Sequence, residues 1–145
     1  MAMDPCRAIE NLVYLYAERI DAGDLEGVAE LFADATIDTP GAEGVTGKDA
    51  VFAMYEQVVR IHDDGTPRTR HVTTNVRIEV EEDTATAHSS YVVVQATDAL
   101  PLQPIIVGRY SDEFAKVDGS WRFRRRTMHV DLVGDVSQHL GQPSS

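Results

Sequence analysis

The hydrophobic pattern changes near residue 68, and this change restricts the possible folds more than any other feature of the sequence. Before it, apolar residues recur at intervals of three and four, which is typical of amphipathic helices. After it, β-branched and aromatic residues alternate with polar ones, which is typical of half-buried strands. Four long strands are predicted, at about residues 69–81, 84–97, 104–117 and 120–133. Helices followed by such a meander predict an α+β domain, with helices packed on one face of a curved antiparallel sheet.

The first half of the chain carries the signals that begin and end helices. Asp4 followed by Pro5 is typical of a helix N-terminus, and Gly23 predicts the end of that first helix. Asp24 predicts the cap of a second, short helix. A short strand at about residues 36–39 and a third helix complete this half.

The length of 145 residues predicts one domain, residues 1–145, with loose ends at about 1–5 and 136–145. The formal net charge of -11 argues against nucleic-acid partners, which are held by basic surfaces. The single cysteine, Cys6, excludes an internal disulfide and fits a reducing compartment. No stretch resembles a signal peptide or a membrane span, so we expect a cytoplasmic protein without a membrane partner.

Asp21 occupies a position in the first helix that normally disfavours an acid. It lies in the last turn, near the negative end of the helix dipole, where a cation is preferred. It also lies on the apolar stripe, in line with Val13 and Ala17. The helix end explains Gly23 and Asp24 but not Asp21, so we expect a specific partner for this carboxylate.

The long strands offer several polar side chains whose roles depend on which face is buried. Strict alternation places His71 and Asn75 on one face of the first long strand and Val72 on the other. Spacing alone favours a solvated polar face, which makes His71 an ordinary surface residue. On the last strand, Arg126 shares its face with apolar residues, and its alternative role is a salt bridge to an acid.

The order of several short segments resembles the SnoaL-like branch of the NTF2-like superfamily, which includes scytalone dehydratase and lindane dehydrochlorinase. These segments are IDAGD, LFADAT, TRH, SSY and GRYSDEFAKVDGSWRF, followed by a final basic strand. The resemblance covers about residues 7–134 and implies a cone-like curved sheet that packs against three helices.

The resemblance also implies a catalytic pair and a third site residue. In dehydratase-like members, an aspartate that closes the first helix pairs with a histidine that opens the sheet, and these positions correspond to Asp21 and His71. The aspartate fixes the histidine tautomer, so that the free ring nitrogen removes a proton from carbon. In dehydrochlorinase-like members, an arginine five residues after the strand tryptophan lines the pocket. Counted from Trp121, this residue is Arg126, which is expected to stabilise developing negative charge.

The remaining pocket positions are expected to be more apolar than in those enzymes. Ile20 and Val94 stand where scytalone dehydratase-like members carry a tyrosine and a second histidine. The expected substrate contacts are Ile20, Phe52, Tyr55, Asn75, His88, Val92 and Val94. Such a lining favours a small hydrophobic, cyclic metabolite as the substrate.

No cofactor or metal is expected. No glycine-rich phosphate loop follows a strand. His129 and Asp131 supply only two potential metal ligands, so a charged rim or subunit contact is favoured over a metal site. His62 is expected at the end of the third helix as a cation near the dipole, and His139 is expected in the loose tail without a role.

Three functions are compatible with this fold. The first is a cofactor-independent, dehydratase-like lyase or isomerase, which predicts an open pocket shared by Asp21, His71 and Arg126. The second is a non-catalytic ligand-binding or scaffold subunit, similar to the small subunit of ring-hydroxylating dioxygenases, with a pocket filled by side chains. The third is a polyketide cyclase, which differs from the first mainly in its substrate. The resemblance also implies a homodimer or homotrimer.

Overall fold

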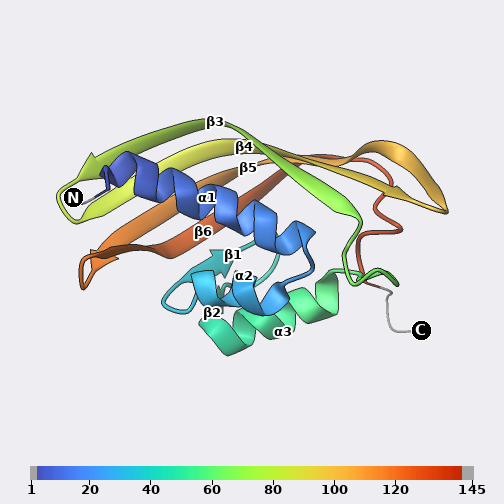
Figure 1. The fold of residues 1–145 in the computed structure, drawn as a ribbon, viewed down its shortest axis with the longest axis horizontal. Coiled ribbons are helices and arrows are strands. Elements are labelled where there is room, and N and C mark those ends of the chain that lie inside the picture. Colours follow the sequence, from blue (N-terminus) through green and yellow to red (C-terminus); the bar gives the residue numbers. More distant parts are fainter. Residues whose placement is uncertain (1–2, 142–145) are drawn as a thin grey trace.

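The computed structural model describes residues 3–141, which form three helices and six strands (Figure 1). The helices are α1 (Pro5–Asp21), α2 (Leu25–Leu31) and α3 (Lys48–Val58). The strands are β1 (Thr36–Asp38), β2 (Val45–Thr46), β3 (Thr69–Glu81), β4 (Thr84–Thr97), β5 (Leu100–Val117) and β6 (Ser120–Val133). The outermost parts of the ends that were expected to be loose, 1–2 and 142–145, lie outside the described residues.

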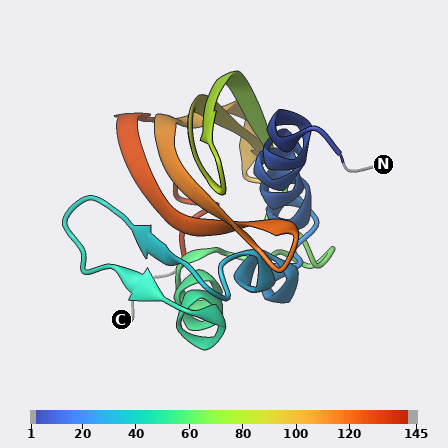
Figure 2. The same ribbon diagram turned by 90° about the vertical axis from the view of Figure 1, so that its left-hand side faces the viewer.

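The six strands of the described chain form one sheet in the order β2-β1-β6-β5-β4-β3. The long strands β3 to β6 make an antiparallel meander, and β1 joins β6 in parallel. Figure 2 shows the strong curvature of this sheet, with α1 beside β3 and with α2 and α3 near β1 and β2. The predicted α+β class is confirmed, but the sheet is mixed and contains β2, which was not expected. No helix within residues 3–141 is long and apolar enough to cross a membrane.

Helix α1 forms because its apolar residues make one stripe and its first turn is capped. The carboxylate of Asp4 accepts a hydrogen bond from the backbone N–H of Cys6 at 2.7 Å, as the Asp-Pro signal predicts. The stripe contains Ile9, Val13, Tyr16 and Ile20, which are all buried against the sheet. The helix therefore fixes its last residue, Asp21, against the adjacent strand.

The space between the helices and the concave face of the sheet is filled with aromatic side chains. The buried rings are those of Tyr16, Phe32, Tyr55, Tyr91, Tyr110, Phe114 and Phe123. Tyr91 and Tyr110 stack with their centroids 4.3 Å apart, and Tyr16 meets Tyr110 edge-on at 5.9 Å. Such contacts add to the free energy gained by burying the rings.

A β-bulge in β3 changes the faces that alternation predicts for this strand. The pairing with β4 shifts by one residue around Asn75, whose φ of 55° lies in the left-handed region. As a result, His71 and Ile78 both face α1, although unbroken alternation places them on opposite faces. Val72 lies on the outer face, where it is 43% exposed. The histidine at the start of β3 is therefore an inward-facing residue.

Strand β5 begins at Leu100, four residues earlier than predicted, although Pro101 and Pro104 lie within it. Its first residue paired with β6 is Ile106, which lies opposite Val133. The prolines therefore occupy a part of β5 that has a neighbour on one side only, where a missing N–H costs no ladder hydrogen bond.

The chain after β6 docks onto the body of the protein, although it was expected to be loose from about residue 136. We call residues 134–141 the C-terminal segment. Leu140 forms an isolated bridge with Val59, and the backbone N–H of Arg60 donates to the carbonyl of His139 at 2.8 Å. This segment thus runs beside the chain that follows α3.

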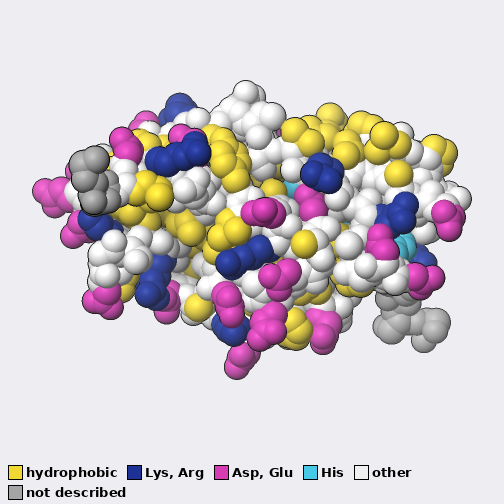
Figure 3. Space-filling view, in the orientation of Figure 1, with side chains coloured by type: hydrophobic (Ala, Val, Ile, Leu, Met, Phe, Trp, Pro, Cys, Tyr) yellow, Lys and Arg dark blue, Asp and Glu magenta, His cyan; other side chains and the backbone are white. Residues whose placement is uncertain are grey.

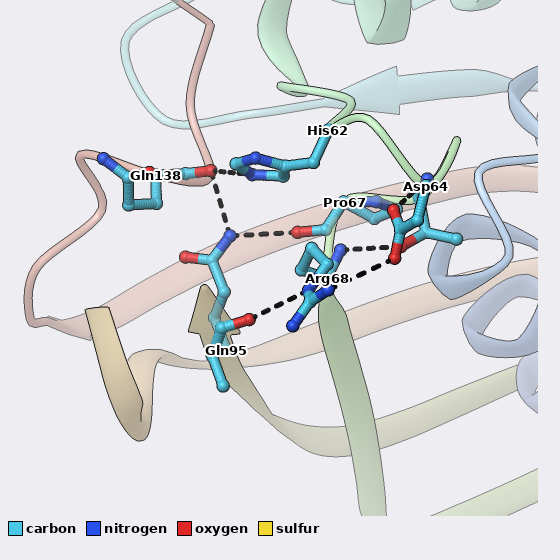
Figure 4. Close-up of polar contacts among 8 residues, drawn as sticks. His62, Asp64, Pro67, Arg68, Gln95 and Gln138 are labelled. Carbon is cyan, nitrogen blue, oxygen red and sulfur yellow. Dashed lines mark hydrogen bonds and ion pairs between the residues drawn. The ribbon is translucent and has the colours of Figure 1, made fainter. Parts of the chain in front are cut away.

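Figure 4 shows the side chains that hold this segment. The Gln95 amide of β4 donates to the carbonyls of Pro67 and Gln138, each at 2.9 Å. His62 donates through its Nε2 to the Gln138 carbonyl at 2.8 Å. Because α3 ends at Val58, the expectation that His62 lies at the helix end was wrong, and His62 instead anchors the C-terminal segment.

Candidate active site

Asp21 is the last residue of α1, and the backbone alone closes the helix end around it. The N–H of Asp24 donates to the Arg19 carbonyl at 2.9 Å, and the N–H of Gly23 donates to the Ile20 carbonyl at 3.0 Å. These are the two hydrogen bonds of a Schellman motif, and Gly23 has the positive φ of 78° that the motif requires. The Asp21 side chain is therefore not needed for capping and turns toward β3.

The Asp21 carboxylate accepts three hydrogen bonds from the start of β3. Thr69 donates through its hydroxyl at 2.8 Å, and His71 donates through its backbone N–H at 2.7 Å. The Nδ1 atom of His71 lies 2.7 Å from Oδ1 of Asp21. The side chains of His71 and Asp21 are only 5% and 12% exposed, so these contacts replace most of the water that would otherwise solvate the carboxylate. The partner expected for Asp21 is His71.

A groove of about 440 Å³ lies between α1 and β3, and Asp21 and His71 form part of its wall. It is lined by Tyr14, Ala17, Glu18, Asp21, Ala22, Arg70, His71 and Thr73. The groove is open to solvent and combines an apolar wall with charged side chains at its rim. A small molecule in this groove would lie against the Asp21–His71 pair.

The side of His71 away from Asp21 faces the interior and the C-terminal segment. The His71 ring meets the ring of Tyr16 edge-on at 6.2 Å and the ring of His139 at 6.4 Å. His139 is only 5% exposed, and this burial, together with nearby His71, lowers its pKa to about 4. A residue to which the sequence assigned no role is thus a neutral imidazole beside the candidate base. The signal that could have revealed it is the pair of apolar residues Val136 and Leu140, which bracket it in an otherwise polar tail.

Three tyrosines form the buried layer next to His71. The hydroxyls of Tyr16 and Tyr55 are 2.8 Å apart, and Tyr16 also contacts Tyr110. Burial raises the pKa of all three phenols above the ordinary value. These hydroxyls therefore stay protonated at neutral pH and act as hydrogen-bond donors.

Arg126 does not contact Asp21 or His71, although all three were expected to meet in one pocket. Its guanidinium is fully buried and makes two hydrogen bonds to Asp112, at 2.8 and 2.9 Å. Its central carbon also lies 3.7 Å from the centroid of Tyr110 and 4.5 Å from that of Tyr16. Burial by itself lowers the pKa of Arg126, but the Asp112 carboxylate raises it above the ordinary value. The arginine is a paired, permanent cation inside the aromatic core.

The pocket residues predicted on the helices lie in the core. Ile20 and Tyr55 are 2% and 5% exposed, and Phe52 packs against the same core while partly accessible. Because the aromatic rings fill the interior, Ile20 and Tyr55 pack against other side chains and do not line the groove between α1 and β3.

The pocket residues predicted on the strands were assigned to the wrong face. The buried face of β4 carries Ala85, Ala87, Ser89, Tyr91, Val93 and Gln95. His88, Val92 and Val94 therefore point away from the helices, and Asn75 is exposed at the bulge. The error arose because the run of three valines at 92–94 places apolar residues on both faces of β4. Before Tyr91, the inner face carries only small residues, which do not distinguish it from the outer face.

Two groups of polar side chains occupy the outer face of the sheet. The hydroxyl of Ser111 lies 3.5 Å from Nδ1 of His88 and 3.3 Å from Nε2 of His129. Asp131 accepts two hydrogen bonds from Arg109, at 2.9 and 3.0 Å. The carboxylate that was considered as a metal ligand is therefore paired with an arginine. Within residues 3–141, no three His, Cys, Asp or Glu side chains are placed to hold a metal ion together.

Comparisons with known proteins place this fold in a family. A SnoaL-like domain matches residues 3–127. A protein of unknown function from Mycobacterium tuberculosis, solved as an aspartate-to-asparagine variant, is 31% identical over 88% of this chain and 77% of that chain, with a TM-score of 0.73. A Novosphingobium aromaticivorans protein provisionally named scytalone dehydratase is 29% identical over 90% of this chain and 86% of that chain, with a TM-score of 0.72.

The fold itself is shared more widely. An NTF2-like protein with a cystatin-like fold, also from Novosphingobium aromaticivorans, is 23% identical over 92% of this chain and 85% of that chain, with a TM-score of 0.73. The helices, the curved sheet and the matched domain lead to one conclusion: the chain belongs to the SnoaL-like family and has the NTF2-like fold.

Proposed function

We propose that this protein is a cofactor-independent, dehydratase-like lyase or isomerase that acts on a small hydrophobic, cyclic metabolite. His71 is the general base, and Asp21 is the residue that positions it. The observation that carries this proposal is the 2.7 Å contact between Nδ1 of His71 and Asp21, at the wall of a groove. Membership of the SnoaL-like family supports it, since this fold includes isomerases, dehydratases and polyketide cyclases.

The contact assigns each ring nitrogen of His71 a separate task. Asp21 accepts a hydrogen bond from the protonated Nδ1, so the neutral ring keeps a free lone pair on Nε2. Among residues 3–141, no group hydrogen-bonds this Nε2 atom. The Nε2 atom takes a proton from a carbon next to a carbonyl group, and the C–H electrons form an enolate. Asp21 stabilises the imidazolium produced, as the carboxylate does in other acid–base dyads.

The same imidazolium then completes either reaction. In an isomerase it returns the proton to a different carbon of the enolate. In a dehydratase it gives the proton to a leaving hydroxyl group, so that water departs and a carbon–carbon double bond remains. Arg126 contributes indirectly in this proposal, because its pairing with Asp112 keeps Tyr16 and Tyr110 in place beside the base.

A non-catalytic subunit is the second candidate function, and one observation favours it. The interior is filled by tyrosine and phenylalanine side chains, as expected for a scaffold. Under this alternative, the Asp21–His71 pair only fastens β3 to α1. The two candidates differ in whether His71 reacts with a carbon acid.

The proposal includes a homodimer or homotrimer that assembles through the outer face of the sheet. One apolar residue from each long strand lies in a continuous row, in the paired positions Val72, Val92, Val107 and Leu132. Val72 and Leu132, at its two ends, are 43% and 66% exposed. Figure 3 shows further hydrophobic side chains gathered over the end of the sheet where β4 joins β5. Covering such a row would remove apolar surface from water.

The proposal is tested with 2-tetralone, a small bicyclic ketone with acidic C–H bonds next to its carbonyl. The exchange of its C–H hydrogens in deuterated buffer reports proton abstraction directly and does not require the natural substrate. We expect the protein to accelerate exchange and His71→Gln to abolish the acceleration. His88→Gln is the matched control, because His88 lies on the outer face of the sheet, away from the groove, and should leave the rate unchanged.

Either of two results contradicts the proposal. The first is an exchange rate equal to that of buffer over a panel of cyclic ketones with the folded protein. The second is acceleration that His71→Gln leaves intact. The first result favours the scaffold alternative, and the second shows that a group other than His71 is the base.

A further inference from the structure

Proton abstraction next to a carbonyl creates an oxyanion, and the proposed site needs a group to stabilise it. Arg126, the residue expected for this task, is bound to Asp112 and does not contact His71. Asp21 is negatively charged and repels an oxyanion. Another polar side chain near His71 is therefore needed to stabilise the oxygen.

His139 is the buried polar side chain that lies next to His71. Its ring centroid is 6.4 Å from that of His71, and the planes are inclined by 64°. A substrate oxygen and the carbon next to it are close enough together to contact two imidazoles at this separation. The two histidines come from opposite ends of the sheet region of the chain, since His71 opens β3 and His139 follows β6.

The Nδ1 atom of His139 has no hydrogen-bond partner among residues 3–141, although it is fully buried. Nearby, Oε1 of Gln95 is also buried without a partner, while the amide nitrogen of Gln95 binds the Gln138 carbonyl. A buried polar atom without a partner costs about 1–3 kcal/mol. Such a cost at Nδ1 of His139 is explained if an acceptor atom of a ligand receives its hydrogen bond.

We propose that His139 is a second histidine of the site, which donates a hydrogen bond from Nδ1 to the carbonyl oxygen of the substrate while His71 removes the neighbouring proton. This inference rests on the proposed function and adds the oxygen-binding residue to it. No covalent bond to His139 forms or breaks. The C–H proton goes to Nε2 of His71, and the charge that develops on oxygen is held by the His139 N–H.

The C-terminal segment gives His139 the fixed position that such a role requires. The carbonyl of His139 accepts the backbone N–H of Arg60 at 2.8 Å, and its own N–H donates to the Val136 carbonyl at 3.1 Å. The residue after His139, Leu140, forms a β-bridge with Val59. A donor held in place before the reaction needs no reorganisation when the oxyanion forms.

The burial of His139 also suits a donor of this kind. Its pKa of about 4, lowered by burial and by His71, keeps the imidazole neutral at neutral pH. A neutral imidazole holds one N–H and gives its hydrogen bond without transferring its proton to the substrate. It also leaves His71 without a cationic neighbour before the reaction begins.

Three substitutions of His139 separate a role of Nδ1 from a role in packing. His139→Asn places an amide N–H close to the position of Nδ1, whereas His139→Gln places it near the position of Nε2. His139→Leu fills a similar volume and removes both polar atoms. His139→Leu removes a buried polar atom that has no partner, and with it the free-energy cost of that atom. The variant should therefore unfold at the same temperature as the wild type or at a higher one.

Two probes report the effect. The first is deuterium exchange into 2-tetralone, and the second is the binding of 2-naphthol, an aromatic analogue of the 2-tetralone enol, followed by its fluorescence. We expect His139→Leu and His139→Gln to slow exchange ~100-fold, the loss found when one oxyanion donor is removed. The same two variants should weaken 2-naphthol binding about tenfold, and His139→Asn should retain most of both activities.

The outcomes distinguish this inference from the function on which it rests. If His71→Gln abolishes exchange while all three His139 variants exchange at the wild-type rate, the role of His139 is wrong and the function stands. If the wild-type protein gives no exchange, the proposed function fails. If His139→Asn loses as much activity as His139→Leu while both remain folded, the hydrogen bond from Nδ1 is wrong.

Discussion

The carboxylate of Asp21 accepts two hydrogen bonds from His71, one from its backbone N–H and one from its Nδ1, each at 2.7 Å. The backbone bond fixes the position of β3 against the end of α1, and the ring bond fixes the imidazole. One carboxylate at an unfavourable helix position thus determines the position and the orientation of the candidate base.

Asp21→Asn should remove most of the proton-abstraction activity while the protein stays folded. An amide keeps the size of the side chain but cannot stabilise the imidazolium, and the loss for a positioned acid–base group is on the order of 10²–10⁴-fold. Deuterium exchange into 2-tetralone measures it. Asp64→Asn is the control, because Asp64 lies in an exposed turn, where it binds Thr66 and Arg68. Equal losses in the two variants contradict the account.

His139 should make the protein less stable in acid. Burial, His71 and His62 lower its pKa from 6.5 to about 4, and Asp21 acts in the opposite direction. Because the folded pKa lies below the unfolded one, the folded state binds fewer protons between these two values. The contribution of His139 is therefore fully present above about pH 6.5 and is lost as the pH falls toward about 4, for a total of about 3 kcal/mol.

This pH dependence is measured by urea unfolding of the wild type and of His139→Leu at about pH 7.5 and about pH 4.5. Carboxylates titrate in both proteins, so the difference between the two proteins isolates His139. The wild type should lose more stability than the variant. Parallel losses would show that His139 does not stay neutral in the folded state.

The buried pair of Arg126 and Asp112 should behave as a coupled unit. Replacing one partner, as in Asp112→Asn or Arg126→Met, leaves a charged or polar group buried without its partner and should cost about 3–5 kcal/mol. Replacing both with Met and Leu should cost less than the sum of the single changes. A double-mutant cycle by urea unfolding provides the test, and additive free energies would argue against coupling.

Leu132→Asp should shift the protein toward the monomer. The substitution places a charge at the end of the row formed by Val72, Val92, Val107 and Leu132, where a second copy would bury it without a partner. Sedimentation velocity over a range of concentrations gives the mass. Val58→Asp is the control, because Val58 is 45% exposed on α3, away from this face. A wild type that is monomeric at every concentration contradicts the proposed assembly.

Local patterns predicted much of the fold. The bounds of β3, β4 and β6 agree with the predicted ranges, because alternation and turn residues act within a few positions. The start of β5 and the short strand β2 were missed, because their pairing depends on neighbours that are distant in the sequence. Asp4 and Gly23 begin and end α1 as predicted, since capping is a local property.

The site was predicted less completely, for physical reasons that particular residues show. Asp21 stood out because its position opposes the helix dipole, and the structure pairs it with His71. The inward orientation of His71 depends on the bulge at Asn75, which alternation does not reveal. Arg126 forms the salt bridge that was its alternative role, and His139, which was given no role, is buried. Both outcomes depend on tertiary packing, against Asp112 in one case and through the docked C-terminal segment in the other. The catalytic roles remain predictions.

The central claim, that Asp21 fixes the proton on Nδ1 of His71 and leaves Nε2 free, is tested most directly by NMR of the ring nitrogens. Long-range proton–nitrogen correlation spectra at alkaline pH identify the neutral tautomer of each histidine, and His71→Gln assigns the signal. The account predicts that His71 is protonated at Nδ1 in the wild type and shifts to a mixture of tautomers in Asp21→Asn. A wild-type His71 that carries its proton on Nε2 would contradict the account.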